Sequence, residues 1–189
     1  MSHYDDESKL RLEAKMIYRT LRSEFDSIEG FENFINSMQD QTDDMTIYLS
    51  GEFQEYHWCF KFQDFINRYC GEVTIVAPAD SNYAAGILFV TANSKKVVVP
   101  TSTMRFGKPW WILNSGNSRE QRAENEKSNM QGKYATEYVD GVLKQILTKE
   151  EYAVYESGEF VSLYYDRCKE VAALAEKLFY KPKEKKSEC

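Results

Sequence analysis

Residues 72–83 read EVTIVAPADSNY and lead from one apolar run through a polar turn into another. The first run, 72–77, is nearly continuous in apolar residues, which is typical of a strand buried on both faces of a parallel sheet. The second run, 83–91, predicts a short apolar helix. The turn contains Asp-Ser-Asn directly before this helix, and such residues are good helix N-caps. We therefore predict that Ser81 is a cap or turn residue.

Strands and helices alternate along most of the chain, which predicts an α/β fold with a mostly parallel sheet. Runs of β-branched, aromatic and other apolar residues predict strands at 45–49, 72–77 and 96–99. Apolar residues at helical spacing predict several helices. One begins within 26–30 and ends near 38, three lie at 56–68, 83–91 and 165–179, and a long one begins in the polar stretch 118–129 and runs to 146. A capping box formed by Thr148 and Glu151 predicts the start of one further helix.

The first part of the chain allows two predictions. Leu10, Ala14, Ile17 and Leu21 keep helical spacing, but residues 16–21 also suit a first strand. We therefore divide the chain into an N-terminal segment at 1–24, helix or strand, a domain at 25–180, and a charged flexible tail at 181–189.

Composition excludes several classes of protein. The 189 residues carry a net charge of −6, which disfavours nucleic acid as a partner. No apolar run approaches the roughly 20 residues of a membrane helix, and the acidic start shows no signal peptide, so we expect a cytoplasmic protein. The four cysteines lie far apart and are expected to be free thiols. Neither a metal nor another cofactor is expected, because the two histidines have no partner at ligand spacing.

Four stretches resemble ClpP-type serine peptidases. Residues 77–83, APADSNY, resemble the family's Gly-x-Ala-x-Ser-small-small, with Ser81 in the place of the nucleophile. Residues 100–107, PTSTMRFG, resemble Pro-x-Ser-x-x-Met-x-His, and residues 47–54, IYLSGEFQ, resemble a strand that ends in Gly-Gly. Residues 147–163 resemble the Leu-Thr-x-Glu-Glu…Gly-Glu segment of phage-type members. The resemblance implies a ClpP/crotonase-like fold of repeated ββα units with a mostly parallel sheet and an extended handle helix.

The catalytic positions of that family are changed in this chain. Gly107 stands in the place of the general base, and Glu159 is the only candidate for the orienting acid. Phe53 and Gln54 replace the glycine pair that helps to form the oxyanion hole, and bulky Tyr83 falls where the family has a small residue. A serine without a base is a poor nucleophile, and phenylalanine does not offer the backbone freedom of glycine. The resemblance therefore implies a catalytically degenerate member.

Three alternatives remain open on the sequence. Ser81 could be an active nucleophile if His57, early in the 56–68 helix, were a displaced base, which would make the protein an active ATP-dependent Clp-type serine endopeptidase. Lys95, Lys96 or Lys108 could form a Ser-Lys dyad, although a catalytic lysine must be desolvated and the first two are expected in a polar turn. A crotonase-like acyl-CoA binder is the third alternative.

The resemblance also implies partners. Such a protein would be a ring-forming scaffold or a regulatory subunit that assembles with itself, with an active ClpP-type subunit or with an AAA+ unfoldase. Its place would be the cytoplasm, or the host cytoplasm if it is encoded by a phage.

Overall fold

The structure is a computed structural model. It describes residues 10–16, 19–25, 28–38, 43–53, 56–77, 81–109 and 119–183. The chain divides into two compact units, a larger one of Met1–Phe106 with Ser162–Cys189 and a smaller one of Gly107–Val161.

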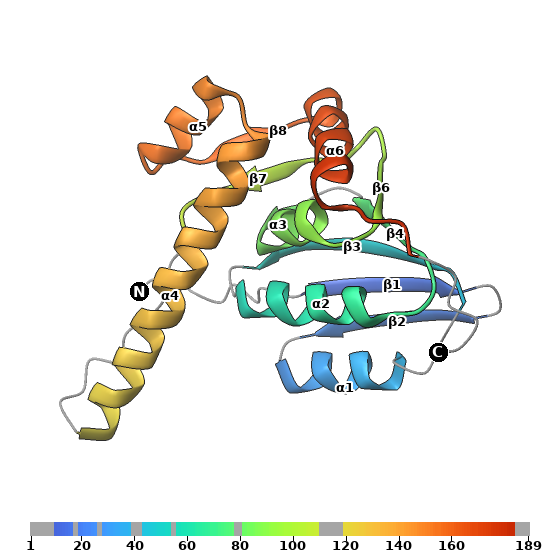
Figure 1. Cartoon of the computed structure of the whole chain (residues 1–189), viewed down its shortest axis with the longest axis horizontal. Coiled ribbons are helices and arrows are strands. Elements are labelled where there is room, and N and C mark those ends of the chain that lie inside the picture. Colours follow the sequence, from blue (N-terminus) through green and yellow to red (C-terminus); the bar gives the residue numbers. More distant parts are fainter. Residues whose placement is uncertain are drawn as a thin grey trace, which may run out of the picture. The chain divides into compact units, whose positions relative to one another are not determined.

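The larger unit is built on a sheet whose central strand, β3 (Met45–Phe53), has two parallel neighbours. Its first half pairs with β4 (Val73–Ala77), and its last three residues pair with β5 (Ser81–Tyr83). The parallel pairing continues from β4 to β6 (Lys95–Val98) and from β5 to β7 (Met104–Phe106). The short strand β8 (Val161–Leu163) lies beside β7. The predicted α/β fold with a mostly parallel sheet is confirmed (Figure 1).

Where the structure describes it, the N-terminal segment forms two strands and no helix, but the expected single strand at 16–21 is wrong in its bounds, because one strand ends at Met16 and the next begins at Arg19. The hairpin of β1 (Leu10–Met16) and β2 (Arg19–Phe25) is antiparallel, and β1 is also antiparallel to β3. The run LRLEAKM of β1 alternates apolar and charged residues with a period of two. That alternation places one kind of side chain on each face of a strand and outweighs the helical spacing in the same residues.

Each predicted helix is present. The larger unit contains α1 (Ile28–Met38), α2 (Tyr56–Arg68), α3 (Ala84–Thr91) and α6 (Tyr165–Phe179). The smaller unit contains α4 (Arg119–Ile146) and α5 (Lys149–Glu156). All eight residues of α3 are buried, and this helix packs on β3 and β5 and against α2 and α6 (Figure 1). Such burial is possible because the helix contains no charged residue.

The ends of α5 are fixed by local hydrogen bonds. The predicted capping box is confirmed, since Thr148 accepts from the Glu151 N–H and the Glu151 carboxylate accepts from the Thr148 N–H. At the other end Gly158 has φ +90°, its N–H donates to the Tyr155 carbonyl, and the Glu159 N–H donates to the Val154 carbonyl. This pattern is a Schellman motif, in which glycine readily adopts the left-handed conformation. The Gly-Glu pair therefore has a structural role as a helix stop.

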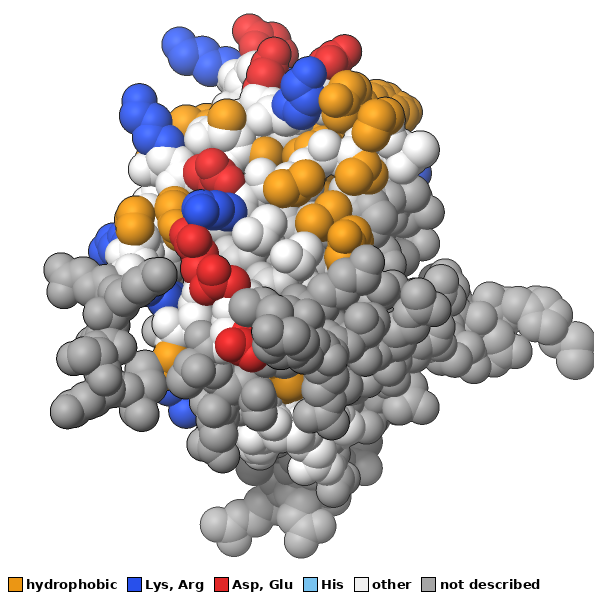
Figure 2. Space-filling model, turned by 90° about the vertical axis from the view of Figure 1, so that its right-hand side faces the viewer, with side chains coloured by type: hydrophobic (Ala, Val, Ile, Leu, Met, Phe, Trp, Pro, Cys, Tyr) orange, Lys and Arg blue, Asp and Glu red, His pale blue; other side chains and the backbone are white. Residues whose placement is uncertain are grey.

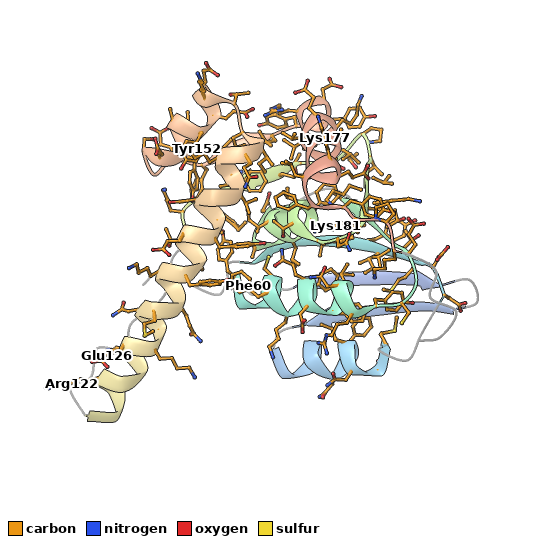
Figure 3. The ribbon with its side chains drawn as sticks, viewed as in Figure 1. Phe60, Arg122, Glu126, Tyr152, Lys177 and Lys181 are labelled. Carbon is orange, nitrogen blue, oxygen red and sulfur yellow. The ribbon has the colours of Figure 1, made fainter. Side chains whose placement is uncertain are left out.

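The segment after α6 makes defined contacts. The Lys181 N–H donates to Asn93 Oδ1 over 2.7 Å, and Lys183 Nζ donates to the carbonyls of Ile66 and Tyr69 at the end of α2. Figure 3 labels Lys181 where the chain leaves α6. The last six residues of the predicted tail, 184–189, lie outside the described residues.

The cysteines differ in state. Cys59 and Cys168 are free and buried. Cys70 is disulfide-bonded, so the expectation of a free thiol is wrong for this residue. Among the described residues, no helix is long and apolar enough to cross a membrane, and no group of three or more His, Cys, Asp or Glu side chains could hold a metal ion.

Gly86 gives a test of how closely α3 packs. A Cβ at this position would lie 2.9 Å from the Ser81 carbonyl oxygen and 2.9 Å from Phe106 Cε1. Because one of these atoms belongs to the backbone, we expect Gly86→Ala to destabilise the protein by about 1–3 kcal/mol, the usual cost of overpacking. Urea unfolding followed by circular dichroism measures the change.

Gly141→Ala is the matched control, because a Cβ at this position in α4 meets no atom within 4 Å. Alanine is the better helix former, so this variant should gain roughly 0.5–1 kcal/mol. A Gly86→Ala variant as stable as the wild type would show that α3 does not approach β5 as closely as described.

Candidate functional site

The stretch in which the resemblance places the nucleophile, residues 77–83, ends in the short strand β5. β5 lies between β3 and β7, with Ser81 opposite Gly51 on one side and opposite Met104 on the other. α3 begins at Ala84, and its N-cap is Tyr83, whose side chain makes no cap hydrogen bond. The prediction that Ser81 is a cap or turn residue is therefore wrong, because Ser81 lies in β5 and Tyr83, at the end of that strand, is the N-cap of α3.

Ser81 is fully buried, and its polar groups bond to the backbone of the sheet. Its Oγ donates to the Leu49 carbonyl over 3.0 Å, and its N–H donates to the Thr103 carbonyl over 3.0 Å. A catalytic serine must instead present its hydroxyl to a base and to a substrate carbonyl. The role of Ser81 as a nucleophile stays a prediction, but in this structure its hydroxyl ties β5 to β3.

Tyr83 holds the strained point of the turn. It has φ 52° and ψ −118°, and among the described residues it is the one non-glycine residue with a positive φ. Such a conformation costs on the order of 1–3 kcal/mol and persists only where the surroundings enforce it. The surroundings here are the pairing of Tyr83 with Phe53 and the buried helix that follows directly.

The neighbourhood of Tyr83 is aromatic and apolar. Burial raises the pKa of Tyr56, at the start of α2, and the nearby Cys59 and Tyr83 side chains raise it further. Burial also raises the pKa of the Cys59 thiol, against a hydrogen bond with Thr91 that lowers it. Tyr56 and Cys59 therefore stay protonated at neutral pH, and neither can serve as a base.

The other candidate positions are dispersed along the chain. His57 lies in α2, but its side chain is outside the described residues, as is Gln54. Gly107 directly follows β7, and Glu159 is exposed after the turn at Gly158. The structure brings the backbones of Phe53 and Tyr83 together, whereas the roles of His57 and Glu159 stay predictions.

Lys95 and Lys108 are engaged in ion pairs. Lys95 Nζ lies 3.0 Å from Glu72, and both side chains are partly exposed. Within the smaller unit, Lys108 Nζ lies 3.1 Å from Asp140 and 4.1 Å from the centre of the Tyr155 ring. The Tyr155 hydroxyl donates to the same Asp140 oxygen. The cluster joins Lys108 to α4 and α5.

Lys96 is buried, and its expected position in a polar turn is wrong. It is 8% exposed, and its Nζ donates to the carbonyls of Ala92 and Ser94 over 2.9 and 3.0 Å. Burial lowers its pKa to about 8, although Glu176 acts in the opposite direction. A cation at this place satisfies carbonyls at the C-terminal end of α3 and matches the helix dipole. The length of α3, about 12 Å for eight residues, lies between Lys96 and the strand β5 that contains Ser81.

Ser102, the serine of the second family-like stretch, also has a structural role. Its Oγ donates to the Ala77 carbonyl at the end of β4 and accepts from the Val99 N–H over 3.0 Å. Its own N–H donates to the Val99 carbonyl over 2.8 Å. No pattern in the sequence indicates this role, because the partners lie on two different strand ends.

Comparison with known proteins identifies the fold. No protein-family model matches the chain, and no curated protein matches it. Among solved structures, the chain is similar to a ClpP1 mutant from Listeria monocytogenes, with a TM-score of 0.55, 12% identity, and coverage of 76% of this chain and 79% of that one. It is also similar to a peptidase from Plasmodium falciparum, with a TM-score of 0.54, 12% identity, and coverage of 76% and 84%. The chain therefore has the fold of ClpP peptidases, and at this identity the likeness concerns the fold alone.

The buried lysine predicts a pH dependence of stability. Lys96 has a pKa of about 8 in the folded chain, below its ordinary value of 10.5. Below pH 8 it is charged in both states, so the cost of burying the charge is fully present. Between pH 8 and 10.5 the unfolded chain binds more protons, so this group makes the free energy of unfolding rise with pH.

We therefore expect the wild type to gain stability relative to Lys96→Met as the pH is raised from 7 to 10. Urea unfolding of both chains at each pH gives the difference between their free energies of unfolding. The contributions of the tyrosines and cysteines that both chains contain cancel in this difference. Lys95 lies on the same strand but is exposed, so Lys95→Met is the control for removing a lysine that is not buried. A difference between wild type and Lys96→Met that does not change with pH would contradict the lowered pKa.

Proposed function

We propose that this protein is a ClpP-fold homologue without serine peptidase activity, acting as a ring-forming scaffold or regulatory subunit. The observation that carries the proposal is the Ser81 hydroxyl, which is fully buried and bonded to the Leu49 carbonyl. A hydroxyl in this position cannot attack a peptide carbonyl unless β5 moves away from β3.

The chemistry around the turn supports the same conclusion. Acyl transfer by serine needs a base, and the position of the base is Gly107. It also needs backbone donors that can approach a developing oxyanion closely, and Phe53 stands where glycine would allow this. Loss of the base alone could leave residual catalysis by an oxyanion hole, but a change to both leaves little.

Exposed apolar side chains support an assembly role. Hydrophobic side chains gather on the upper part of the face shown in Figure 2. The exposed apolar side chains of the larger unit include Val97 of β6 and Leu178 of α6, and Tyr164 directly before α6 is 70% exposed. In the smaller unit, Met130 and Tyr134 of α4 are 74% and 59% exposed. A contiguous apolar patch, unlike single exposed side chains, is typical of contacts between proteins, and we propose that the surface seen in Figure 2 serves as such a contact.

The partners that we propose are other copies of this chain, an active ClpP-type subunit or an AAA+ unfoldase, with no nucleic acid and no membrane. The place that we propose is the cytoplasm, or the host cytoplasm if the protein is encoded by a phage.

We expect a fluorophosphonate probe, which modifies activated serines, to leave the wild-type chain unlabelled. An active ClpP-type peptidase serves as the positive control, and intact mass spectrometry counts the bound probe. Stoichiometric labelling that is lost in Ser81→Ala would overturn the proposal and favour the active endopeptidase. In that case His57→Ala would show whether His57 is the displaced base.

We also expect the native assembly to contain several subunits of 22.1 kDa, alone or mixed with an active ClpP-type protein. Native mass spectrometry of the separate and mixed proteins measures the stoichiometry. A chain that remains a monomer in both experiments would contradict the scaffold role and leave the absence of peptidase activity to the labelling experiment.

A further inference from the structure

We infer that Tyr83, and not Ser81, occupies the position from which this fold would present a nucleophile, so that the serine is replaced and not kept. The inference deepens the proposed function and rests on it, because it concerns the same site. According to this inference, a molecule bound at that site would contact Tyr83 and not Ser81.

The backbone of the turn is the first argument. Hydrolases that present a nucleophile between a strand and a helix hold it at a sharp, strained turn, where its side chain points out of the sheet. Tyr83 has this place: it is the last residue of β5, the N-cap of α3 and the residue with φ 52°. Ser81 is the first residue of β5, two residues before this turn, and it is paired on both sides with no exposed surface.

The register of β5 against β3 is the second argument. Phe53, the first residue in the place of the family's glycine pair, lies directly opposite Tyr83. Ser81 lies opposite Gly51, two residues before that pair. In an active peptidase, the oxyanion hole and the nucleophile must act on the same carbonyl group of the substrate, so they must lie next to each other. Of the two residues, Tyr83 is therefore the one in the matching position.

The sequence is the third argument, because a shift of two residues improves the match. In residues 79–85, ADSNYAA, the small residues Ala79, Ser81, Ala84 and Ala85 coincide with the small positions of Gly-x-Ala-x-Ser-small-small. In this alignment Tyr83 falls at the position of the serine, and no bulky residue falls at a position where the family has a small one. Ser81 takes the place of the alanine, a buried site that suits a small side chain, and its carbonyl oxygen lies close to Gly86.

The replacement has a steric consequence. A tyrosine side chain reaches much farther from the backbone than a hydroxymethyl group. At the turn it fills space in which a peptide carbonyl would be attacked. The neighbouring Tyr56 side chain, which is within electrostatic range of Tyr83, adds a second aromatic group to this site.

Cysteine substitutions test which position is presented. The variants Tyr83→Cys and Ser81→Cys are treated with iodoacetamide between pH 6 and 10 without reductant, and the wild type measures any reaction of the chain's own four cysteines. A thiol at the N-terminus of a helix ionises more readily than an ordinary one, whereas burial suppresses ionisation. We expect Tyr83→Cys to react at least about ten times faster than Ser81→Cys at pH 7, with a titration midpoint below the ordinary value of about 8.5. Equal rates, or faster reaction of Ser81→Cys, would overturn the inference.

A stability comparison keeps the inference testable if a cysteine variant does not fold. At the strained turn, glycine relieves the positive φ and alanine does not, so Tyr83→Gly should have a higher urea midpoint than Tyr83→Ala. Within the extended strand the order should reverse, with Ser81→Ala above Ser81→Gly. The opposite order at residue 83 would overturn the inference.

The two proposals fail in different ways. A wild-type chain that stays unlabelled by the fluorophosphonate while Ser81→Cys is the faster thiol overturns the inference about Tyr83 and leaves the inactive scaffold standing. Labelling of the wild type at Ser81 overturns the proposed function itself.

Discussion

The buried helix α3 is the constraint on which the larger unit depends. All eight of its residues are buried, so the polar groups at its two ends must be satisfied inside the protein. At one end the chain turns sharply from β5 through Tyr83, and at the other end the buried ammonium group of Lys96 binds two carbonyls. Between the ends, Gly86 permits close contact with β5 and β7.

Several family-like residues of the chain have local structural roles within their own units. Ser81 joins β5 to β3, and Ser102 joins the ends of β4 and β6. Gly158 ends α5 in a conformation that glycine adopts readily. None of these roles requires catalysis, and each would persist in a protein that has lost it. The resemblance to peptidases therefore supports the fold more strongly than it supports the reaction.

The sequence predicted the long elements well and the short ones poorly. The bounds of α2 and α6 and the capping box at Thr148 follow from patterns that extend over several residues. β5, β7 and β8 have three residues each, too few to show a period, and they exist because neighbouring strands pair with them. Lys96 was assigned to solvent because the helix end that it neutralises is apparent only in three dimensions. The place of the strained turn was missed for the same reason, since the positive φ of Tyr83 leaves no mark on composition.

The strain at Tyr83 needs a cause other than catalysis if the protein is inactive. Strained turns in enzymes place a reactive group, but this turn also delivers the chain from a strand paired on both sides into a helix that is buried throughout. Relaxing φ at residue 83 would redirect α3, and the packing around Gly86 leaves little room for that. On our inference that residue 83 is the nucleophile position, the fold keeps the geometry of that turn with a tyrosine in place of the serine. It follows that the geometry alone does not distinguish an enzyme from a scaffold in this fold, and that the identity of the residue at the turn does.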